Sequence, residues 1–404
     1  MIPPRWLTAF RLAGYGAGYF FAAGAFMSYW PVWLRHRDIT DAQIGTLFMA
    51  RQFVGVAATL GIGFLAHRIG NLRGMLLALS VAAVVMMGAY QVSYTFLALL
   101  IVGLIWGVVW SPTLALYDGV LVNEARARGL VYGRLRLWGS VAFILGTMLC
   151  GLAVQELGPP WVLYVGLAGI LLMVPFAVTL PTAESHPIGA ARHAPFSVLA
   201  LFRSRPFLLF MIAAGFCQSS HAVLYSFGTL TWRGAGIDDV TISLLWGESV
   251  AVEILMMLLS GWLIHRIGVT GMIGVGLACG LVRWTGLAFT NDLVALVFLQ
   301  ALHAGTFAAS HLGAMAFIQR SLPSSGVALG QSIYYALGTG ATQAVIFQFA
   351  GLLYARYGQH AFLGMTAISA IGMIALLLLA RLWKGEVLVG ATASPEVSAT
   401  GRVP

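Results

Sequence analysis

The chain has 404 residues, of which 60% are hydrophobic and only 9% are charged. A water-soluble domain carries roughly a quarter charged residues, so this composition excludes a soluble protein and places the chain in a lipid bilayer. The net charge of +9 does not indicate a nucleic-acid partner, because the basic residues lie singly or in small groups between apolar runs.

Twelve apolar segments are long enough to cross a bilayer, which takes a helix of about 20 residues. In chain order, the sequence predicts spans at residues 10–34, 42–66, 73–92, 95–122, 135–155, 161–180, 206–232, 240–264, 270–289, 292–319, 326–355 and 360–382. Proline and glycine inside these spans are tolerated in membrane helices. The first span is long and no small-residue cleavage site follows it, so we expect no cleaved signal peptide. The predicted fold class is all-α integral membrane protein.

A polar stretch with several prolines separates the first six spans from the last six. It occupies residues 181–205, and the sequence after residue 384 is polar as well. We therefore expect an N-terminal six-helix bundle at 1–180, a cytoplasmic linker at 181–205, a C-terminal six-helix bundle at 206–384 and a disordered cytoplasmic tail at 385–404.

The positions of the arginines predict the orientation, because cytoplasmic loops are enriched in Lys and Arg. Two of the 22 cationic residues, Arg51 and Arg283, lie within spans. Four fall in loops on the side opposite the termini: Arg35, Arg37, Arg233 and Arg356. The other sixteen lie on the side of the termini, so we expect both termini in the cytoplasm and a multi-pass protein of the inner (plasma) membrane.

The two halves of the sequence repeat each other at an offset of 198 residues. Residues 63–70 (Gly-Phe-Leu-Ala-His-Arg-Ile-Gly) recur at 261–268 (Gly-Trp-Leu-Ile-His-Arg-Ile-Gly), with six identities in eight positions. The same offset pairs Asp41 with Asp239. An even number of spans gives both copies the same membrane orientation, so the sequence predicts two parallel six-helix halves.

The repeated segment resembles a loop motif of the major facilitator superfamily, Gly-x-x-x-Asp-Arg-x-Gly-x-x-Arg. His67 and His265 stand at the acidic position, so the gating contact of that acid does not carry over. The glycines permit tight turns and close helix approach, and Arg68 can bond carbonyls at a helix C-terminus. The resemblance implies a gating role for seven residues: Gly63, Arg68, Gly70, Arg73, Gly261, Arg266 and Gly268.

A closer resemblance is to the 3-phenylpropionate permease branch, which is related to nucleoside and oligosaccharide proton symporters. Residues 132–143, which include Arg-Leu-Trp-Gly-Ser, and residues 279–284, which include Val-Arg-Trp, carry this resemblance, and it covers most of the chain. It implies a monomeric carrier that takes up a small aromatic carboxylate, such as 3-phenylpropionate, with protons by alternating access. Span 5 lacks the Gly-Pro pair of the antiporter branch, which favours symport.

Ionisable groups inside spans are costly to bury and are functional candidates by default. In the second half, Glu253, Arg283 and His303 or His311 lie on three successive spans and predict a proton-coupling network. Burial strengthens proton binding by a carboxylate and an approaching arginine weakens it, so movement can drive proton release. Resemblance to sugar–proton symporters implies these roles for Glu253, Arg283 and His311. The alternative is a static buried ion pair, with each histidine bonding two helices together.

Six further residues are candidates for contact with the solute: Asp118, Arg136, Arg51, His221, Trp246 and Phe307. Asp118 and Arg136 resemble the substrate-side pair of sugar symporters, although Arg136 also suits an interfacial anchor. The roles of Arg51 and Glu248 stay open. No metal cluster, nucleophile–base arrangement or phosphate loop occurs in the sequence, so we expect no enzyme, metal or cofactor.

Two solute classes follow from these residues. An aryl carboxylate needs one cation and ring partners, which Arg51, Arg283, His221 and the many aromatic residues offer. A sugar or nucleoside needs several hydroxyl partners, and the candidates are Gln218, Ser219, Ser220, Thr229, Gln331, Tyr334 and Gln343. A proton-coupled sugar or nucleoside symporter is therefore the alternative, and a solute sensor without transport is a more distant one.

Overall fold

The computed structural model describes residues 4–181 and 198–388. Residues 182–197 of the expected linker and 389–404 of the expected tail lie outside the described residues. In the first half, each span is one continuous helix: α1 (Arg5–His36), α2 (Asp41–Ile69), α3 (Leu72–Gln91), α4 (Phe96–Arg128), α5 (Tyr132–Leu157) and α6 (Trp161–Thr179).

In the second half, most spans are built from several pieces. The elements are α7 (Val198–Arg203), α8 (Arg205–Ser219), α9 (Ala222–Gly234), α10 (Asp239–Phe289), α11 (Leu293–Ala301), the π-helix η1 (Ala304–Ala309), α12 (Ser310–Ser321), α13 (Ser324–Ile333), the π-helix η2 (Tyr334–Ala341), α14 (Thr342–Tyr357), the 3-10 helix η3 (Gly358–Ala361) and α15 (Phe362–Leu382). α10 contains two passages, because its backbone leaves helical geometry at Gly268.

Ten helical stretches in the described residues are long and apolar enough to cross a membrane. One of them, Ser324–Leu382, is 59 residues long and holds two passages separated by η3. α1 adds another passage, because its 32 residues span about 48 Å at 1.5 Å per residue. The twelve passages confirm the predicted number and define a multi-pass membrane protein.

Polar caps and glycines set the helix ends. Thr40 and Gln43 form a capping box at the start of α2, and the Asp238 carboxylate caps α10. Hydrogen bonds from the hydroxyl and the amide of Thr241 hold the pKa of the Asp238 carboxyl below its usual range. At the other end of α2, Gly70 takes the left-handed conformation that closes many helices.

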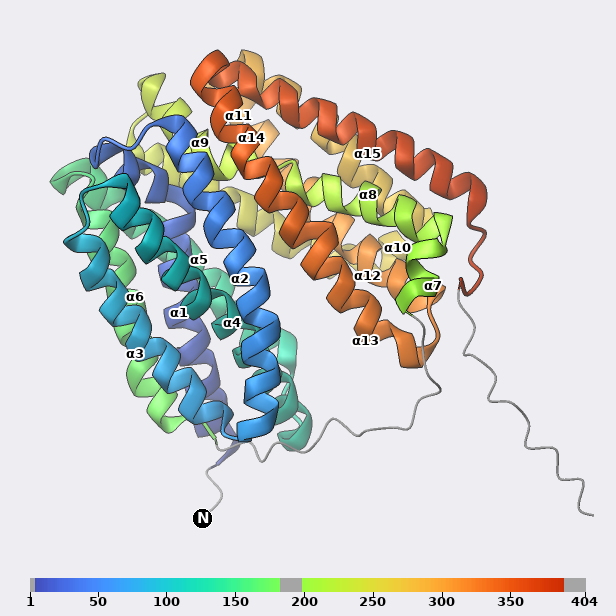
Figure 1. The fold of residues 1–404 in the computed structure, drawn as a ribbon, viewed down its shortest axis with the longest axis horizontal. Coiled ribbons are helices and arrows are strands. Elements are labelled where there is room, and N and C mark those ends of the chain that lie inside the picture. Colours follow the sequence, from blue (N-terminus) through green and yellow to red (C-terminus); the bar gives the residue numbers. More distant parts are fainter. Residues whose placement is uncertain (1–3, 182–197, 389–404) are drawn as a thin grey trace, which may run out of the picture.

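The helices form two bundles that lean together at one end and diverge toward the other (Figure 1). Within the first bundle α1 packs on α5 and α6, and within the second α10 packs on α15 and η1. We call the end where α2 and α10 begin, at Asp41 and Asp239, the distal end. The end where α1 begins and α15 finishes, at Arg5 and Leu382, is the terminal end.

Two equivalent ion pairs lie at the distal end. Asp41 pairs with Arg35, and Asp239 pairs with Arg233 at 3.1 Å. The sequence offset of 198 residues relates both acids and both arginines. The internal repeat therefore appears in the structure as a repeated contact.

Close backbone packing joins the halves beside these ion pairs. A Cβ on Gly351 of α14 would lie 2.8 Å from the Asp41 carbonyl oxygen, and a Cβ on Gly151 of α5 would lie 2.7 Å from that of Asp239. Only glycine allows helices to approach so closely. Four hydrogen bonds also cross between the halves here, joining Tyr29 to Asp239, Thr46 to Gln348, Thr229 to Ser28, and Val240 to Gln155.

Candidate functional site

Arg283 lies in the second passage of α10, and its side chain is fully buried. Its guanidinium donates hydrogen bonds to three neutral acceptors: Nδ1 of His303 at 3.1 Å, Oγ1 of Thr306 at 3.0 Å and Oε1 of Gln300 at 2.7 Å. The cation also lies 4.8 Å from the ring of Trp284. Arg283 forms no ion pair with a carboxylate of the described residues. Neutral dipoles therefore hold this buried cation, and its charge has no anionic partner among the described residues.

His303 connects this arginine to Glu253. Because a guanidinium can only donate, Nδ1 of His303 must be the acceptor, and the ring proton lies on Nε2. That nitrogen is 3.8 Å from Oε2 of Glu253, which is longer than a hydrogen bond but close enough for electrostatic attraction. The imidazole is therefore neutral, and Arg283 orients its proton toward the carboxyl group.

His221 lies at the break between α8 and α9 and is also buried. Its Nδ1 donates to the Gln218 carbonyl at 2.9 Å, so its Nε2 accepts from the Thr306 hydroxyl at 3.0 Å. Thr306 thus accepts from Arg283 and donates to His221. The arrangement fixes the tautomers of both histidines around one cation.

The π-helix η1 places Thr306 and Phe307 in this network. Its widened turn leaves backbone carbonyls that need other partners. The Gln218 amide donates to the Phe307 carbonyl at 3.1 Å and to the Ser310 hydroxyl at 2.8 Å, and the Cys217 thiol donates to the Thr306 carbonyl at 3.5 Å. Side chains of α8 therefore stabilise the π-helix.

A stack of rings follows the same helix. The ring centroids of His303 and Phe307 are 5.3 Å apart, and those of Phe307 and His311 are 6.4 Å apart, with nearly parallel planes. The next ring is Tyr335 of η2, 6.2 Å from His311. The structure therefore separates the two candidate histidines. His303 belongs to the charged network, whereas His311 contacts aromatic rings.

Trp246 lies in the seam between the halves rather than on an open surface. Its indole N–H donates to the Thr229 hydroxyl at 3.0 Å, and that hydroxyl donates to the Ser28 carbonyl of the first half at 2.6 Å. The Trp246 side chain is 3% exposed. Through this bridge, Trp246 helps to hold the two halves together at the distal end.

In the first half, Arg51 extends from α2 among aromatic rings. Its guanidinium is 5.2 Å from the Phe48 ring, and it lines a narrow cavity with Trp30 and Tyr90. The cavity has a volume of about 10 Å³, near the lower limit for one water molecule. Arg51 forms no ion pair within the described residues. A solute would therefore reach Arg51 only after side chains move.

Asp118 and Arg136 lie close enough to interact electrostatically, but they do not form an ion pair. The Arg136 guanidinium packs 3.9 Å from the Phe20 ring. One carboxylate oxygen of Asp118 is buried without a hydrogen-bond partner among the described residues. Arg136 also lies within electrostatic range of Glu253 in the other half. Asp118 and Arg136 therefore lie near the second half without forming an ion pair with each other.

Stacked aromatic rings join α1 and α4 beside these charges. Tyr19 stacks on Trp110 with centroids 4.3 Å apart, and Trp110 stacks on Trp106 at 4.8 Å. The Phe26 ring meets both tryptophans edge-on. Tyr19 lies within electrostatic range of Arg51, Asp118 and Arg136. A ring-bearing solute would find flat apolar partners here.

The glycines of the two loop motifs differ in their packing. Gly70 and Gly268 both have the positive φ that the predicted turn allows, 70° and 72°, but their ψ values of 3° and 177° give two different backbone turns. A Cβ on Gly63 or Gly261 would meet no atom within 4 Å. The close helix approach that these glycines permit is not made at Gly63 or Gly261 in this structure, in which the bundles diverge at the terminal end (Figure 1).

The arginines of the loop motifs lie near the surface. Arg68 places its guanidinium 4.7 Å from the ring of Phe64, rather than bonding carbonyls at a helix end. Arg266 is exposed and Arg73 is partly exposed. The side chain of His67 lies outside the described part of the chain. The gating role of these residues stays a prediction.

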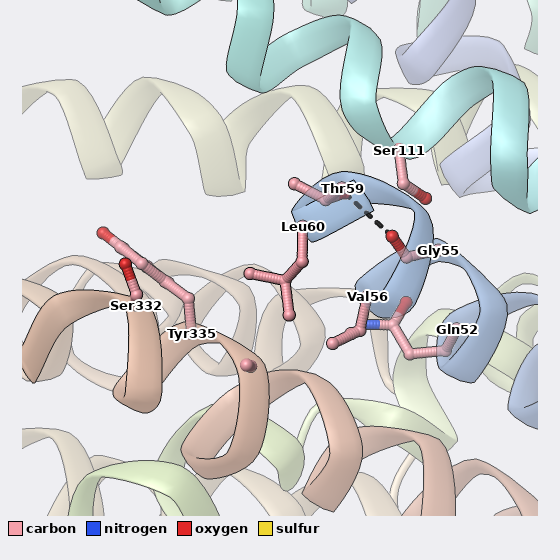
Figure 2. Close-up of a pocket in the computed structure, with 9 residues that line it drawn as sticks. Gln52, Gly55, Val56, Thr59, Leu60, Ser111, Ser332 and Tyr335 are labelled. Carbon is pink, nitrogen blue, oxygen red and sulfur yellow. Dashed lines mark hydrogen bonds between the residues drawn. The ribbon is translucent and has the colours of Figure 1, made fainter. Parts of the chain in front are cut away.

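A cavity of about 300 Å³ lies between the halves, with α2 and α4 on one side and α13 and η2 on the other (Figure 2). Its lining residues are Gln52, Gly55, Val56, Thr59, Leu60, Ser111, Ser332, Tyr335 and Ala336. None of these residues was predictable as a site residue, because small polar residues inside spans form no sequence pattern of their own. The one sequence feature that could have indicated this cavity was Gln52, a polar residue inside a span and adjacent to Arg51.

The model of the MFS_1 like family matches residues 13–364, which is most of the chain. The chain belongs to this family of major facilitator transporters. The transporter is 31% identical over 379 residues to the probable 3-phenylpropionic acid transporter of Escherichia coli (strain K12), and the match covers 91% of this chain and 96% of that one. It is 23% identical to the maltose permease of Geobacillus stearothermophilus, with coverage of 93% and 96%.

Solved structures agree with this assignment. The transporter superposes on the nucleoside transporter NupG with a TM-score of 0.83 at 17% identity, covering 93% of this chain and all of the other. At this identity the likeness shows the fold alone. The comparisons confirm the expected superfamily, and the protein is a transporter rather than an enzyme.

Proposed function

We propose that this transporter is a proton-coupled symporter that takes up a small aromatic carboxylate, such as 3-phenylpropionate, by alternating access. The observation that carries the proposal is the buried cation of Arg283, which is held by neutral partners and joined through His303 to Glu253. An anion receptor and a proton acceptor thus share one network.

The coupling follows from charge. When Glu253 is ionised, its negative charge lies near the cationic network and offsets part of the Arg283 charge. A proton on Glu253 removes that offset, and the buried cation then attracts the carboxylate of the solute more strongly. Binding of the proton first and the anion second restores the buried charge to its starting balance once both are bound.

The hydrogen-bonding groups support a carboxylate over a sugar. Three of the expected hydroxyl partners are already used by the fold: Gln218 bonds the backbone of η1, Ser220 accepts from Trp284, and Thr229 bridges the halves. The partly exposed Trp110 ring, stacked on the buried Tyr19, is an aromatic partner for an aromatic solute. The relative of 31% identity is described as a probable 3-phenylpropionic acid transporter, which supports the same class.

A proton-coupled sugar or nucleoside symporter is the second candidate. The free carboxylate oxygen of Asp118 favours it, because such an oxygen accepts hydrogen bonds from hydroxyl groups. The likeness to a maltose permease and to the fold of NupG also supports it.

We infer that the protein works as a monomer in the inner membrane, with both termini in the cytoplasm. The arginine distribution supports this orientation. The terminal end then faces the cytoplasm, and the structure represents an inward-open state. The bundles at 1–180 and 206–384 would rock about the central site, with the residues of the loop motifs meeting when the terminal end closes.

Uptake by proteoliposomes tests the proposal. Labelled 3-phenylpropionate should accumulate under an inward proton gradient and should not accumulate without it. Glu253→Gln should abolish this accumulation but retain exchange of labelled for unlabelled solute, because exchange needs no net proton movement. Glu156→Gln, at an exposed position of α5 away from the charged network, is the control and should accumulate solute normally. Normal accumulation by Glu253→Gln would remove Glu253 from the coupling step.

A further inference from the structure

The cavity between α2, α4, α13 and η2 differs in chemistry from the charged network, and we call it the neutral pocket (Figure 2). None of its nine lining residues carries a charge. Its volume of about 300 Å³ is at the lower end of ligand pockets, so it suits a molecule with one ring. The function proposed above assigns it no role.

The hydrogen-bonding capacity of the neutral pocket is concentrated on two residues. The hydroxyls of Thr59 and Ser332 donate to carbonyls of their own helices at 2.8 and 2.9 Å, and the Tyr335 hydroxyl donates to a methionine sulfur at 3.5 Å. Because their protons are already donated, these three hydroxyls can only accept hydrogen bonds from a ligand. Gln52 and Ser111 have no hydrogen bond within the described residues, so they supply the donors.

The rest of the lining is apolar. Val56, Leu60 and Ala336 line the pocket together with the ring of Tyr335, while Gln52 and Ser111 come from two different helices of the first half (Figure 2). Burial of an anion without a cation partner costs far more than burial of a hydroxyl that is hydrogen-bonded. A sugar would leave most of its hydroxyls without partners. The lining therefore matches a single ring that carries one uncharged polar group.

We propose that the neutral pocket binds small phenols, with the phenolic hydroxyl held by Gln52 and Ser111 and the ring packed between Leu60 and Tyr335. The hydroxyl donates to the Gln52 carbonyl oxygen or to Ser111 and accepts from the Gln52 amide. This site is independent of the aryl carboxylate proposed above, because it contains no group that would pair with a carboxylate.

The position of the pocket gives the bound phenol a second effect. Gln52 and Ser111 belong to the first half, whereas Ser332 and Tyr335 belong to the second. The halves must move relative to each other during alternating access. A ligand that contacts both halves stabilises the conformation in which the pocket exists, so phenol binding slows transport without competing at the charged network.

Binding of 4-ethylphenol, ethylbenzene and benzoate to the full chain in nanodiscs, corrected with empty nanodiscs, tests the proposal. We expect 4-ethylphenol to bind more tightly than ethylbenzene, and benzoate to bind least. Loss of one neutral hydrogen bond weakens binding by about fivefold. Gln52→Leu and Ser111→Ala should therefore each weaken the binding of 4-ethylphenol by about that factor and leave the binding of ethylbenzene unchanged. Gln331→Leu is the matched control, because Gln331 lies on α13 outside the lining and its amide donates to Met315.

Three results would overturn this assignment. One is equal affinity of the wild type for 4-ethylphenol and ethylbenzene. Another is an equal loss of affinity for 4-ethylphenol in Gln52→Leu and in Gln331→Leu. The third is benzoate binding that depends on Gln52. If Gln52→Leu does not fold, the comparison of Ser111→Ala with Gln331→Leu tests the site by itself. Failure of 3-phenylpropionate uptake would reject the proposed function but not this site, because the ligands and residues differ.

Discussion

Alanine in place of Gly351 would put a methyl group into a close backbone contact between the two halves. The new Cβ would lie 2.8 Å from the Asp41 carbonyl oxygen and 2.8 Å from the Cα of Gly45. Both neighbours are backbone atoms, so no side chain can rotate away. At the equivalent contact, Gly151→Ala would bring a Cβ within 2.7 Å of the Asp239 carbonyl oxygen.

The size of the effect follows from these distances. Ordinary contacts of a Cβ begin at 3.4 Å, so α14 and α2 must separate by 0.6 Å at Gly351, and α5 and α10 by 0.7 Å at Gly151. Overpacking of this kind costs about 1–3 kcal/mol. The contacts exist only while the distal end is closed, so the cost shifts the equilibrium toward distal opening by about 5- to 150-fold.

Distances between spin labels at Asp38 and Ala235 measure this equilibrium, because these exposed residues lie in equivalent distal loops of the two halves. The labelled background needs only Cys279→Ala, since the other two cysteines are buried. Both glycine variants should increase the population with a long distance between labels, and to a similar extent.

Gly119→Ala is the matched control, because a Cβ on Gly119 meets no atom within 4 Å. It should leave the distance distribution unchanged. If a folded Gly351→Ala or Gly151→Ala variant keeps the label-to-label distance distribution of the parent protein, close backbone packing does not hold the distal end closed.

Three further predictions concern the site and the turns. Arg283→Ala should lose both accumulation and exchange of the solute in proteoliposomes, and retained exchange would show that the cation does not bind the solute. Thr306→Val should lower the thermal unfolding midpoint because it breaks the bridge between Arg283 and His221, at a cost of about 1–3 kcal/mol, whereas Thr306→Ser should restore it. Gly268→Ala should cost about 1–3 kcal/mol, because φ 72° and ψ 177° lie in a region that essentially only glycine occupies, and Gly261→Ala, at a helical and uncrowded position, should not.

The architecture was predictable because it depends on local composition. Each passage needs only a long apolar segment, and the arrangement of two halves follows from a repeat that can be read by eye. The structure extends that repeat to the ion pairs of Asp41 and Asp239, whose arginine partners also lie 198 residues apart. The sequence showed the paired acids but not their contacts.

The details of the site were less predictable because they depend on tertiary packing. His303 and His311 occupy one helix stripe, so their spacing alone did not decide between them; the packing of α10 against η1 places only His303 beside Arg283. The π-helix itself depends on Gln218, which lies on another passage. Gln300 and Thr306, which hold the cation, look in sequence like ordinary polar residues.

The two π-helices have a mechanical consequence for the second half. Each accommodates one more residue per turn than its flanking α-helices need, and such a bulge can shift along a helix by one residue. A shift of this kind re-aims the residue that the bulge crosses by about 100°, because each helical residue is turned by that angle from its neighbour, and it leaves both flanks in place. η1 and η2 therefore allow Thr306 and Tyr335 to be re-aimed inside the membrane while the ends of their passages stay in place. The passages of the first half are continuous α-helices, and its described residues contain no π-helix.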